Sequence, residues 1–80
     1  MKYAHCTKRE REDLYKVDAL EPKILTFVSS KKRETLYPVD IADHFGRDTE
    51  ILTSYAIWRL ISDGKLILDK NLTVSVWEKQ

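Results

Sequence analysis

This chain of 80 residues contains only two glycines and two prolines, and their positions divide it into segments. Pro38 suits the first turn of a helix, where its fixed φ is already helical and its missing N–H costs nothing. Gly46 and Gly64 suit the left-handed position that closes a helix. The sequence therefore predicts one helix between Pro38 and Gly46 and a second helix that stops at Gly64.

The second of these helices is expected to begin at Asp48 or Thr49, because either side chain can cap its N-terminus. We expect it to run to Asp63. The apolar residues that recur at helical spacing along one stripe predict its buried face. These residues are Leu52, Ala56 and Leu60, with Ile57 at the edge of the stripe.

A further amphipathic helix is expected from Asp18 onward. Asp18 and Glu21 have the spacing of a capping box, and Val17 and Pro22 can pack around it as a hydrophobic staple. Pro22 is acceptable in the first turn because amides there have no intrahelical partner. The apolar residues that follow at helical spacing form one face, namely Leu20, Ile24, Phe27 and Val28.

Residues 1–17 are expected to form a loose tail and a short, separate helix. Thr7, with a glutamate three residues later, forms a capping box at its start. Leu14 and Val17 provide a short apolar stripe. A short helix is marginal without packing, so this one is either solvated and partly frayed or an arm that packs on a partner subunit. The expected organisation is an extension over 1–17 and one domain over 18–80.

Extended segments are expected on both sides of the last two helices. Residues 35–37 precede a proline, which disfavours the helical conformation in the residue before it. Residues 65–69 and 72–77 alternate between apolar and polar side chains, a pattern typical of strands. Lys70 and Asn71 between them predict a hairpin turn in which Asn71 takes the positive φ.

The order of helix, extended segment, helix, tight turn, helix and β-hairpin resembles a winged helix-turn-helix domain over about residues 18–78. The best-matching segment is 40–46, where the small Ala42 allows close helix crossing and Gly46 permits the turn. Residues 60–67 are similar to the end of a recognition helix that runs into the first wing strand. The expected fold class is α+β, a winged helix-turn-helix with a three-helix core, a C-terminal β-hairpin and an N-terminal helical extension.

The resemblance implies a small DNA-binding protein, a transcriptional regulator that docks its third core helix and its wing on duplex DNA. A homodimer is expected, because a domain of this size is usually marginal alone. The outward face of the third helix would contact the DNA, together with a basic loop and the wing tip. The candidate DNA-binding residues are Arg47, Glu50, Ser54, Tyr55, Trp58, Lys31, Lys32, Arg33 and Lys70.

The same helix face is unusual for reading bases. Only Arg47 favours bidentate base contacts, and Glu50 repels phosphate. The alternative function is therefore a protein–protein interaction module that uses its aromatic face without nucleic acid. Its candidate interface residues are Ile51, Tyr55, Trp58, Leu14 and Val17. A third interpretation is that the chain's own N-terminal helix covers Tyr55 and Trp58.

Charge and composition limit the partners further. The chain carries 14 basic and 13 acidic residues, a net charge of +1, which is weak for a nucleic-acid-binding domain. Any phosphate-binding surface must therefore be local, and RNA or the ribosome is not distinguished from DNA as its target. No apolar run approaches the ~18 residues that a bilayer crossing needs, so no membrane partner is expected. The single cysteine, Cys6, cannot form an internal disulfide, which favours a cytoplasmic protein.

The residue pattern does not favour catalysis. With two glycines far apart, the chain has no glycine-rich phosphate loop, and one cysteine with two separated histidines lacks zinc-ligand spacing. Asp40 and His44 stand four apart and could pair along a helix, but no nucleophile is placed to use them. A surface pair within one helix is the expectation there. We therefore expect no enzyme activity, no cofactor and no metal site.

Overall fold

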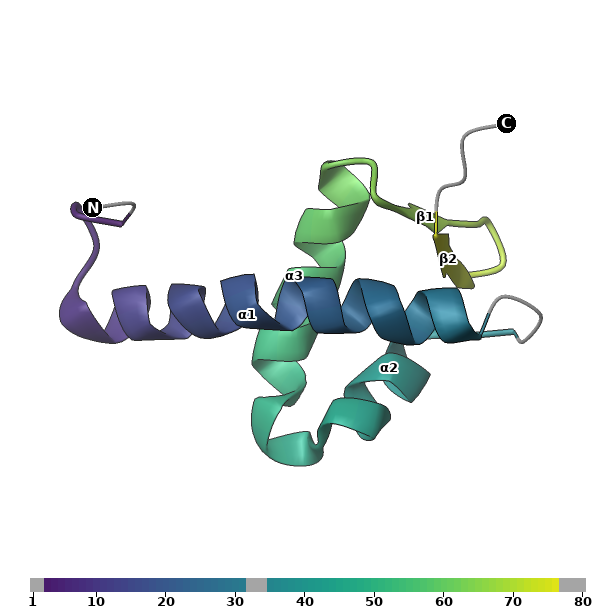
Figure 1. Cartoon of the computed structure of the whole chain (residues 1–80), viewed down its shortest axis with the longest axis horizontal. Coiled ribbons are helices and arrows are strands. Elements are labelled where there is room, and N and C mark those ends of the chain that lie inside the picture. The colour runs from purple at the N-terminus through teal and green to yellow at the C-terminus, as the bar shows by residue number, and fades with distance from the viewer. Residues whose placement is uncertain (1–2, 32–34, 77–80) are drawn as a thin grey trace.

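Helix α1 is the longest element and crosses α3, with the hairpin lying beyond the crossing (Figure 1). The computed structural model describes residues 3–31 and 35–76. Within these ranges the layout is α+β, three α-helices and a two-stranded antiparallel hairpin, and it is compatible with a winged helix. No helix in the described ranges is long and apolar enough to cross a membrane. In chain order the elements are α1 (Lys8–Ser30), α2 (Pro38–Phe45), the 3-10 turn η1 (Arg47–Thr49), α3 (Glu50–Ser62), β1 (Leu66–Leu68) and β2 (Val74–Val76).

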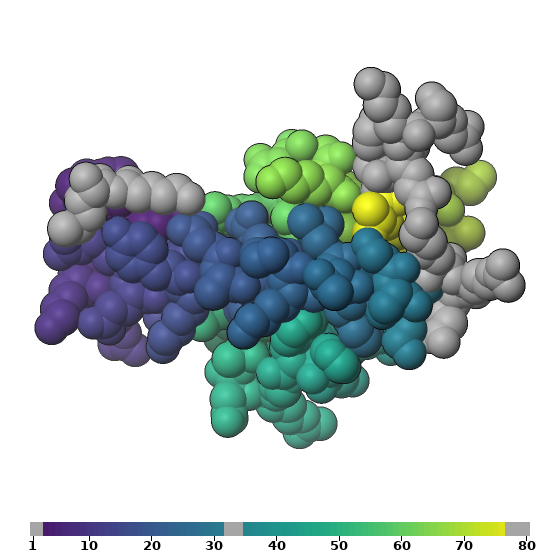
Figure 2. Space-filling view, viewed as in Figure 1, coloured from purple at the N-terminus to yellow at the C-terminus, as the bar shows by residue number. Residues whose placement is uncertain are grey.

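The N-terminal extension and the first core helix are one continuous helix. The prediction of a helix break between residues 17 and 18 is therefore wrong, because α1 continues through this position. The start of α1 is as predicted, since the Thr7 hydroxyl accepts a hydrogen bond from the Glu10 N–H at 3.2 Å. In the space-filling view α1 runs across the whole visible face, with α2 projecting on one side and the end of α3 on the other (Figure 2).

The continuity of α1 has a tertiary cause. Asp18 does not cap a helix, because its carboxylate accepts a hydrogen bond from the Tyr3 hydroxyl at 3.0 Å and pairs with Arg59 of α3 at 2.9 Å. Pro22 therefore lies inside the helix and not in a first turn. Val17 on one side of Pro22 and Ile24 on the other are both fully buried. Burial of both halves against the same core offsets the backbone hydrogen bond that proline removes.

The turn between α2 and α3 forms as predicted. Gly46 has a φ of 97°, and its N–H donates to a carbonyl at the end of α2 at 3.1 Å. The η1 turn then precedes α3, which begins at Glu50. Thr49 does not cap α3, because its hydroxyl donates to the Phe45 carbonyl of the preceding helix at 3.0 Å.

The expected pair between Asp40 and His44 does not form. The Asp40 carboxylate accepts a hydrogen bond from the Tyr37 N–H at 2.9 Å, at the start of α2. The His44 ring stacks on Phe27 of α1, with ring centroids 4.0 Å apart and planes 17° apart. A backbone amide at a helix start and an aromatic neighbour from another helix are better partners than an exposed pair along one helix.

The hairpin has a three-residue loop and not the expected two-residue turn. The Asp69 N–H donates to the Thr73 carbonyl at 2.9 Å and closes a loop of residues 70–72. Leu72 has the positive φ, at 66°, and Asn71 does not. A three-residue loop places its left-handed residue at the last position, which explains why the residue at 72 adopts this conformation although asparagine tolerates it better.

Tyr37 is extended, as predicted, and the residue before it contacts the second strand. The Leu36 carbonyl accepts a hydrogen bond from the Val74 N–H at 2.8 Å. In β2 the side chains alternate as predicted, because Val74 is buried and Ser75 is exposed. The predicted strand over 72–77 includes Trp77, which lies outside the described residues.

The core lies where α1, α2, α3 and the hairpin meet. Helix α3 buries Ala56, Ile57 and Leu60, as predicted, but it also buries Thr53 completely, and Leu52 is only half-buried. The predicted stripe does not include Thr53, because it is traced through apolar side chains alone. The buried apolar residues are Val17, Ile24, Val28, Leu36, Ile41, Ala42, Ala56, Ile57, Leu60, Leu66 and Val74.

Thr53 provides a test of this packing. Its hydroxyl is buried and has no hydrogen-bond partner among the residues that the structure describes, so it carries a desolvation cost that a valine of the same shape does not. We expect Thr53→Val to raise the free energy of unfolding by about 1 kcal/mol, measured by urea denaturation. Thr26→Val is the matched control, because the exposed Thr26 hydroxyl donates to the Pro22 carbonyl at 3.0 Å. Equal effects of the two substitutions would contradict this description of the core.

Candidate interaction surface

Helix α3 leaves three large apolar side chains exposed. Ile51 is 85% exposed, Tyr55 51% and Trp58 54%. The interpretation that the N-terminal helix covers Tyr55 and Trp58 is therefore wrong. At 3.6 residues per turn, positions 51, 55 and 58 lie opposite the buried positions 53, 56, 57 and 60, so they cannot face the core at the same time. Such a cluster of exposed aromatic and aliphatic side chains marks a contact surface.

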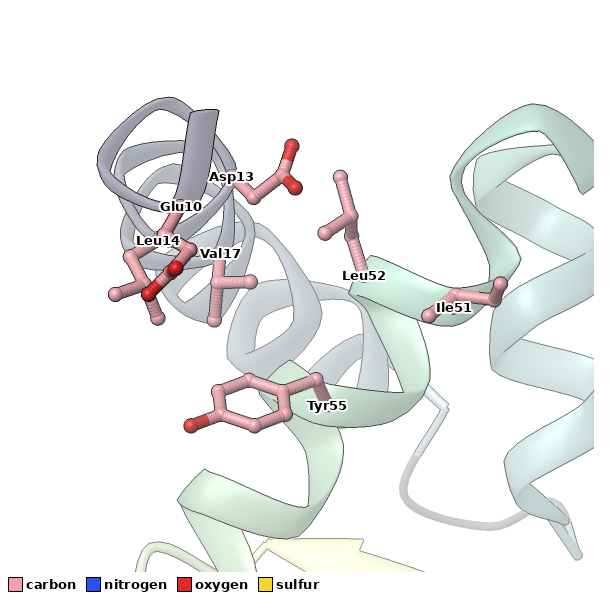
Figure 3. A pocket seen from close by; sticks show the side chains of 7 residues that line it. All are labelled: Glu10, Asp13, Leu14, Val17, Ile51, Leu52 and Tyr55. Carbon is pink, nitrogen blue, oxygen red and sulfur yellow. The ribbon is translucent and has the colours of Figure 1, made fainter. Parts of the chain in front are cut away.

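A groove of about 340 Å³ lies between the N-terminal half of α1 and the first turns of α3. Figure 3 shows the Tyr55 ring of α3 next to Leu14 and Val17 of α1. Four of the five predicted interface residues therefore meet in one place, although they come from two helices. The residues that line the groove are Glu10, Asp13, Leu14, Val17, Ile51, Leu52 and Tyr55.

Val17 has a different role from the one predicted. It is only 1% exposed and belongs to the core, so it forms the floor of the groove and does not project toward a partner. Leu14, one turn earlier, is half-buried. The predicted apolar stripe of the extension is thus divided between the core and the groove, because α1 crosses α3 near Val17 and extends past it.

The two charged residues that line the groove, within residues 3–31 and 35–76, are both acidic. Glu10 and Asp13 project from α1, and their carboxylates lie beside the apolar lining in Figure 3. Among the residues that the structure describes, no lysine or arginine lines it. The groove therefore combines an apolar interior with a negative rim, which favours a ligand that carries both apolar and cationic groups.

Trp58 belongs to a second apolar groove, of about 360 Å³, between the start of α2, α3 and the hairpin loop. Trp58 therefore lines a different groove from Tyr55, although the two side chains are neighbours on the exposed face of α3. Leu72 of the hairpin loop is 63% exposed at this groove. The residues that line it are Tyr37, Pro38, Val39, Trp58, Leu68 and Leu72.

An ion-pair cluster beside the first groove joins α1 to α3. The guanidinium of Arg59 lies 2.9 Å from Asp18 Oδ1, through Nη2, and 3.0 Å from Glu21 Oε1, through Nε. The contact with Glu21 lacks the alignment of a hydrogen bond. The same guanidinium donates to the Tyr3 hydroxyl at 3.4 Å and lies 6.0 Å from the centre of the Tyr55 ring. Sequence patterns place Arg59 only at the boundary of a helix face, so its partners on another helix could not be predicted.

The cluster stabilises the charged form of Arg59. Burial lowers the pKa of Arg59, but its hydrogen bonds with Tyr3 and Asp18 and the charge of Glu21 together raise it more. The pKa therefore ends above the ordinary arginine value, and the guanidinium is protonated at any physiological pH. Arg59 therefore holds α1 and α3 together through its ion pairs with Asp18 and Glu21. It is not counted among the cations that could bind a phosphate group.

The candidate DNA-binding cations do not gather on one element. Lys31 follows the end of α1, Arg47 is exposed in η1 and Lys70 lies in the hairpin loop. Lys32 and Arg33 lie outside the described residues. Residues 38–63, which include α2 and α3, contain five carboxylates and only two arginines, so this segment has a negative net charge. Glu50 and Ser54 are in α3, as predicted, with Glu50 exposed and Ser54 half-buried.

No family model, curated protein or solved structure matches this chain. Within residues 3–31 and 35–76, no three His, Cys, Asp or Glu side chains are grouped so that they could hold a metal ion. Cys6 has a free, partly exposed thiol. The exposed face of α3 and the two grooves beside it are therefore the features from which a function can be inferred.

The Arg59 cluster can be tested by substitution. Arg59→Met would remove the guanidinium that pairs with Asp18 and Glu21, whose side chains are 25% and 14% exposed. We expect a loss of about 1–3 kcal/mol in the free energy of unfolding, measured by urea denaturation at pH 7. Arg9→Met on the exposed side of α1 is the matched control and should change stability by less than about 0.5 kcal/mol. A stability loss no larger than that of the control would show that Arg59 does not hold α1 to α3.

Proposed function

We propose that this protein is a protein-interaction module that binds a short helical segment of a partner protein in the groove between α1 and α3. The observation that supports this proposal is the meeting of Leu14, Ile51 and Tyr55 around one groove with an acidic rim. The groove has room for a few large side chains, and burying each contributes about 1.5–3 kcal/mol. Apolar residues spaced three or four apart on a partner helix would enter such a groove from one face.

The rim specifies the chemistry of the partner. Glu10 and Asp13 lie in the first turns of α1 and line the groove. Lysine or arginine residues that flank the apolar face of the partner helix would pair with these carboxylates. Exposed pairs of this kind each contribute at most about 1 kcal/mol. They select a cationic partner over an acidic one more than they raise affinity.

Docking on duplex DNA is the second candidate function. It is favoured by the winged-helix-compatible layout, in which α3 has an exposed face and the hairpin follows it directly. Arg47, exposed in η1, and Lys70 in the hairpin loop are the described cations best placed to meet phosphates in that arrangement. The acidic balance of residues 38–63 makes this the weaker candidate, because each phosphate contact depends on a basic side chain.

Two synthetic helical peptides test the first proposal. Both carry leucines on one face, and the flanking positions are lysine in one peptide and glutamate in the other. We expect the lysine peptide to bind about tenfold more tightly, since two rim pairs are attractive in one case and repulsive in the other. Fluorescence anisotropy measures the affinity, and amide chemical-shift changes should centre on Leu14, Leu52 and Tyr55.

Charge reversal at the rim gives the decisive variant. Glu10→Lys combined with Asp13→Lys should reverse the preference so that the glutamate peptide binds more tightly. Glu12→Lys combined with Asp43→Lys is the matched control, because both residues are exposed, lie outside the groove and change the net charge equally. Equal binding of the two peptides by the unmodified protein, or an equal response of the two double variants, would overturn the proposal.

The protein samples prepared for the peptide experiments also test docking on duplex DNA, the second candidate function. DNA docking predicts binding to random duplex DNA, measured by anisotropy, that weakens as salt is raised and is lost in Arg47→Glu. The substitution is in η1 and outside the groove, so peptide binding should persist in it. DNA binding that persists in Arg47→Glu would exclude docking through the start of α3.

A further inference from the structure

The second groove has exposed apolar side chains on two of its sides. It lies between the start of α2, α3 and the hairpin loop, and its volume is about 360 Å³. Of the lining residues within 3–31 and 35–76, none carries a charge. Val39 at the start of α2 is 57% exposed and Leu72 in the hairpin loop 63%. This face favours a partner whose own contact surface is apolar.

The backbone at Leu72 adopts an unfavourable conformation. Its φ of 66° is the only positive value for a residue other than glycine among the described residues, and leucine adopts this conformation less readily than asparagine or glycine. The Leu72 side chain is mostly exposed, so burial within one copy of the chain offsets little of that cost. Backbone strain of this kind is typical of positions that have a function.

The exposed apolar area suits one half of a dimer interface. Tyr37 is 44% exposed and Trp58 54%, so with Val39 and Leu72 four large side chains are each about half exposed. A half-exposed side chain of this size presents on the order of 100 Å², and the four together roughly 400 Å². Each partner in an interface of ordinary size buries ~800 Å², of which ~450 Å² is apolar. The face is therefore about large enough to support a stable dimer.

We infer that this face packs against the same face of a second copy of the chain, around a two-fold axis that runs along the groove. This axis places the α2 side of each copy over the hairpin side of the other. Leu72 of each copy then enters the groove of the other copy and contacts Val39 there. A two-fold contact requires one face to supply both the groove and the side chain that fills it, and this face has both.

The charges that border the groove favour a second copy in this orientation. Asp40 is exposed in the first turn of α2, and Lys70 is exposed in the loop that contains Leu72. The axis along the groove brings Asp40 of each copy toward Lys70 of the other, which gives an attractive pair twice. An axis across the groove would instead bring like charges together. Asp69 follows Leu68 and points to the opposite face of the hairpin, because side chains alternate along a strand.

The dimer is independent of the proposed peptide binding, because the two grooves have no described lining residue in common. Failure of the dimer would leave peptide binding intact, and failure of peptide binding would leave the dimer intact. Measuring self-association and peptide binding on the same variants therefore distinguishes the two proposals.

The first test is sedimentation equilibrium of the full chain with Leu72→Asn. Asparagine tolerates the positive φ, so the hairpin loop keeps its conformation while the apolar side chain is lost. We expect self-association to weaken at least about tenfold, because the contact is lost twice. Ile67→Thr is the matched control and should leave the dimer unchanged, because Ile67 is 42% exposed and does not line the groove.

Two outcomes of this test would overturn the inference. One is an unmodified chain that stays monomeric up to about 1 mM, where even a weak dimer would be detected. The face would then serve a different partner. The other is an equal effect of Leu72→Asn and Ile67→Thr, which would place the dimer contact elsewhere.

The second test uses Val39→Gln on the other side of the groove. In a dimer of either single variant, a polar side chain meets an apolar one at both contacts. In a mixed dimer of Leu72→Asn with Val39→Gln, one contact between Leu72 and Val39 is intact and the two polar side chains meet at the other. We expect the mixed dimer to be at least about fivefold tighter than either variant alone. A mixture no tighter than its components would overturn the two-fold arrangement.

Discussion

The ion pairs of Arg59 with Asp18 and Glu21 join two helices that sequence spacing alone does not bring together. All three side chains are at most about one quarter exposed, so the loss of one partner would leave charge in a partly dehydrated position. The cluster sits beside Pro22, where α1 lacks a backbone hydrogen bond. Holding α1 against α3 at this point keeps both halves of the long helix packed on one core.

The exposed apolar residues of α3 reflect the small fraction of its surface that a domain of this size can bury. One face of α3 packs in the core, and Ile51, Tyr55 and Trp58 remain on the other face. Because the chain extends α1 beyond its crossing with α3, part of this apolar face becomes a groove and not a flat patch. The proposed partner helix would bind in this groove between α1 and α3.

Local signals predicted the elements well where the cause was local. Gly46 and Gly64 both have positive φ and follow helix ends, because only a residue without a side chain adopts this conformation at no cost. The break expected at Asp18 was wrong, because a capping box is a weak local preference that a long-range ion pair overrides. The burial of Thr53 was missed for a similar reason, since the position of a residue between neighbouring helices, and not its polarity, decides whether it is enclosed.

The sequence by itself determined the order of the elements, the ends of α2 and α3, and the apolar nature of the residues at positions 14, 51, 55 and 58. Periodicity and turn chemistry act between residues close in the chain, so they can be recognised without coordinates. Only the tertiary structure decided that Leu14 and Tyr55 share a groove while Trp58 belongs to another one. Those placements depend on the angle and point at which α1 crosses α3, which is set by contacts between residues some forty positions apart, such as Asp18 and Arg59.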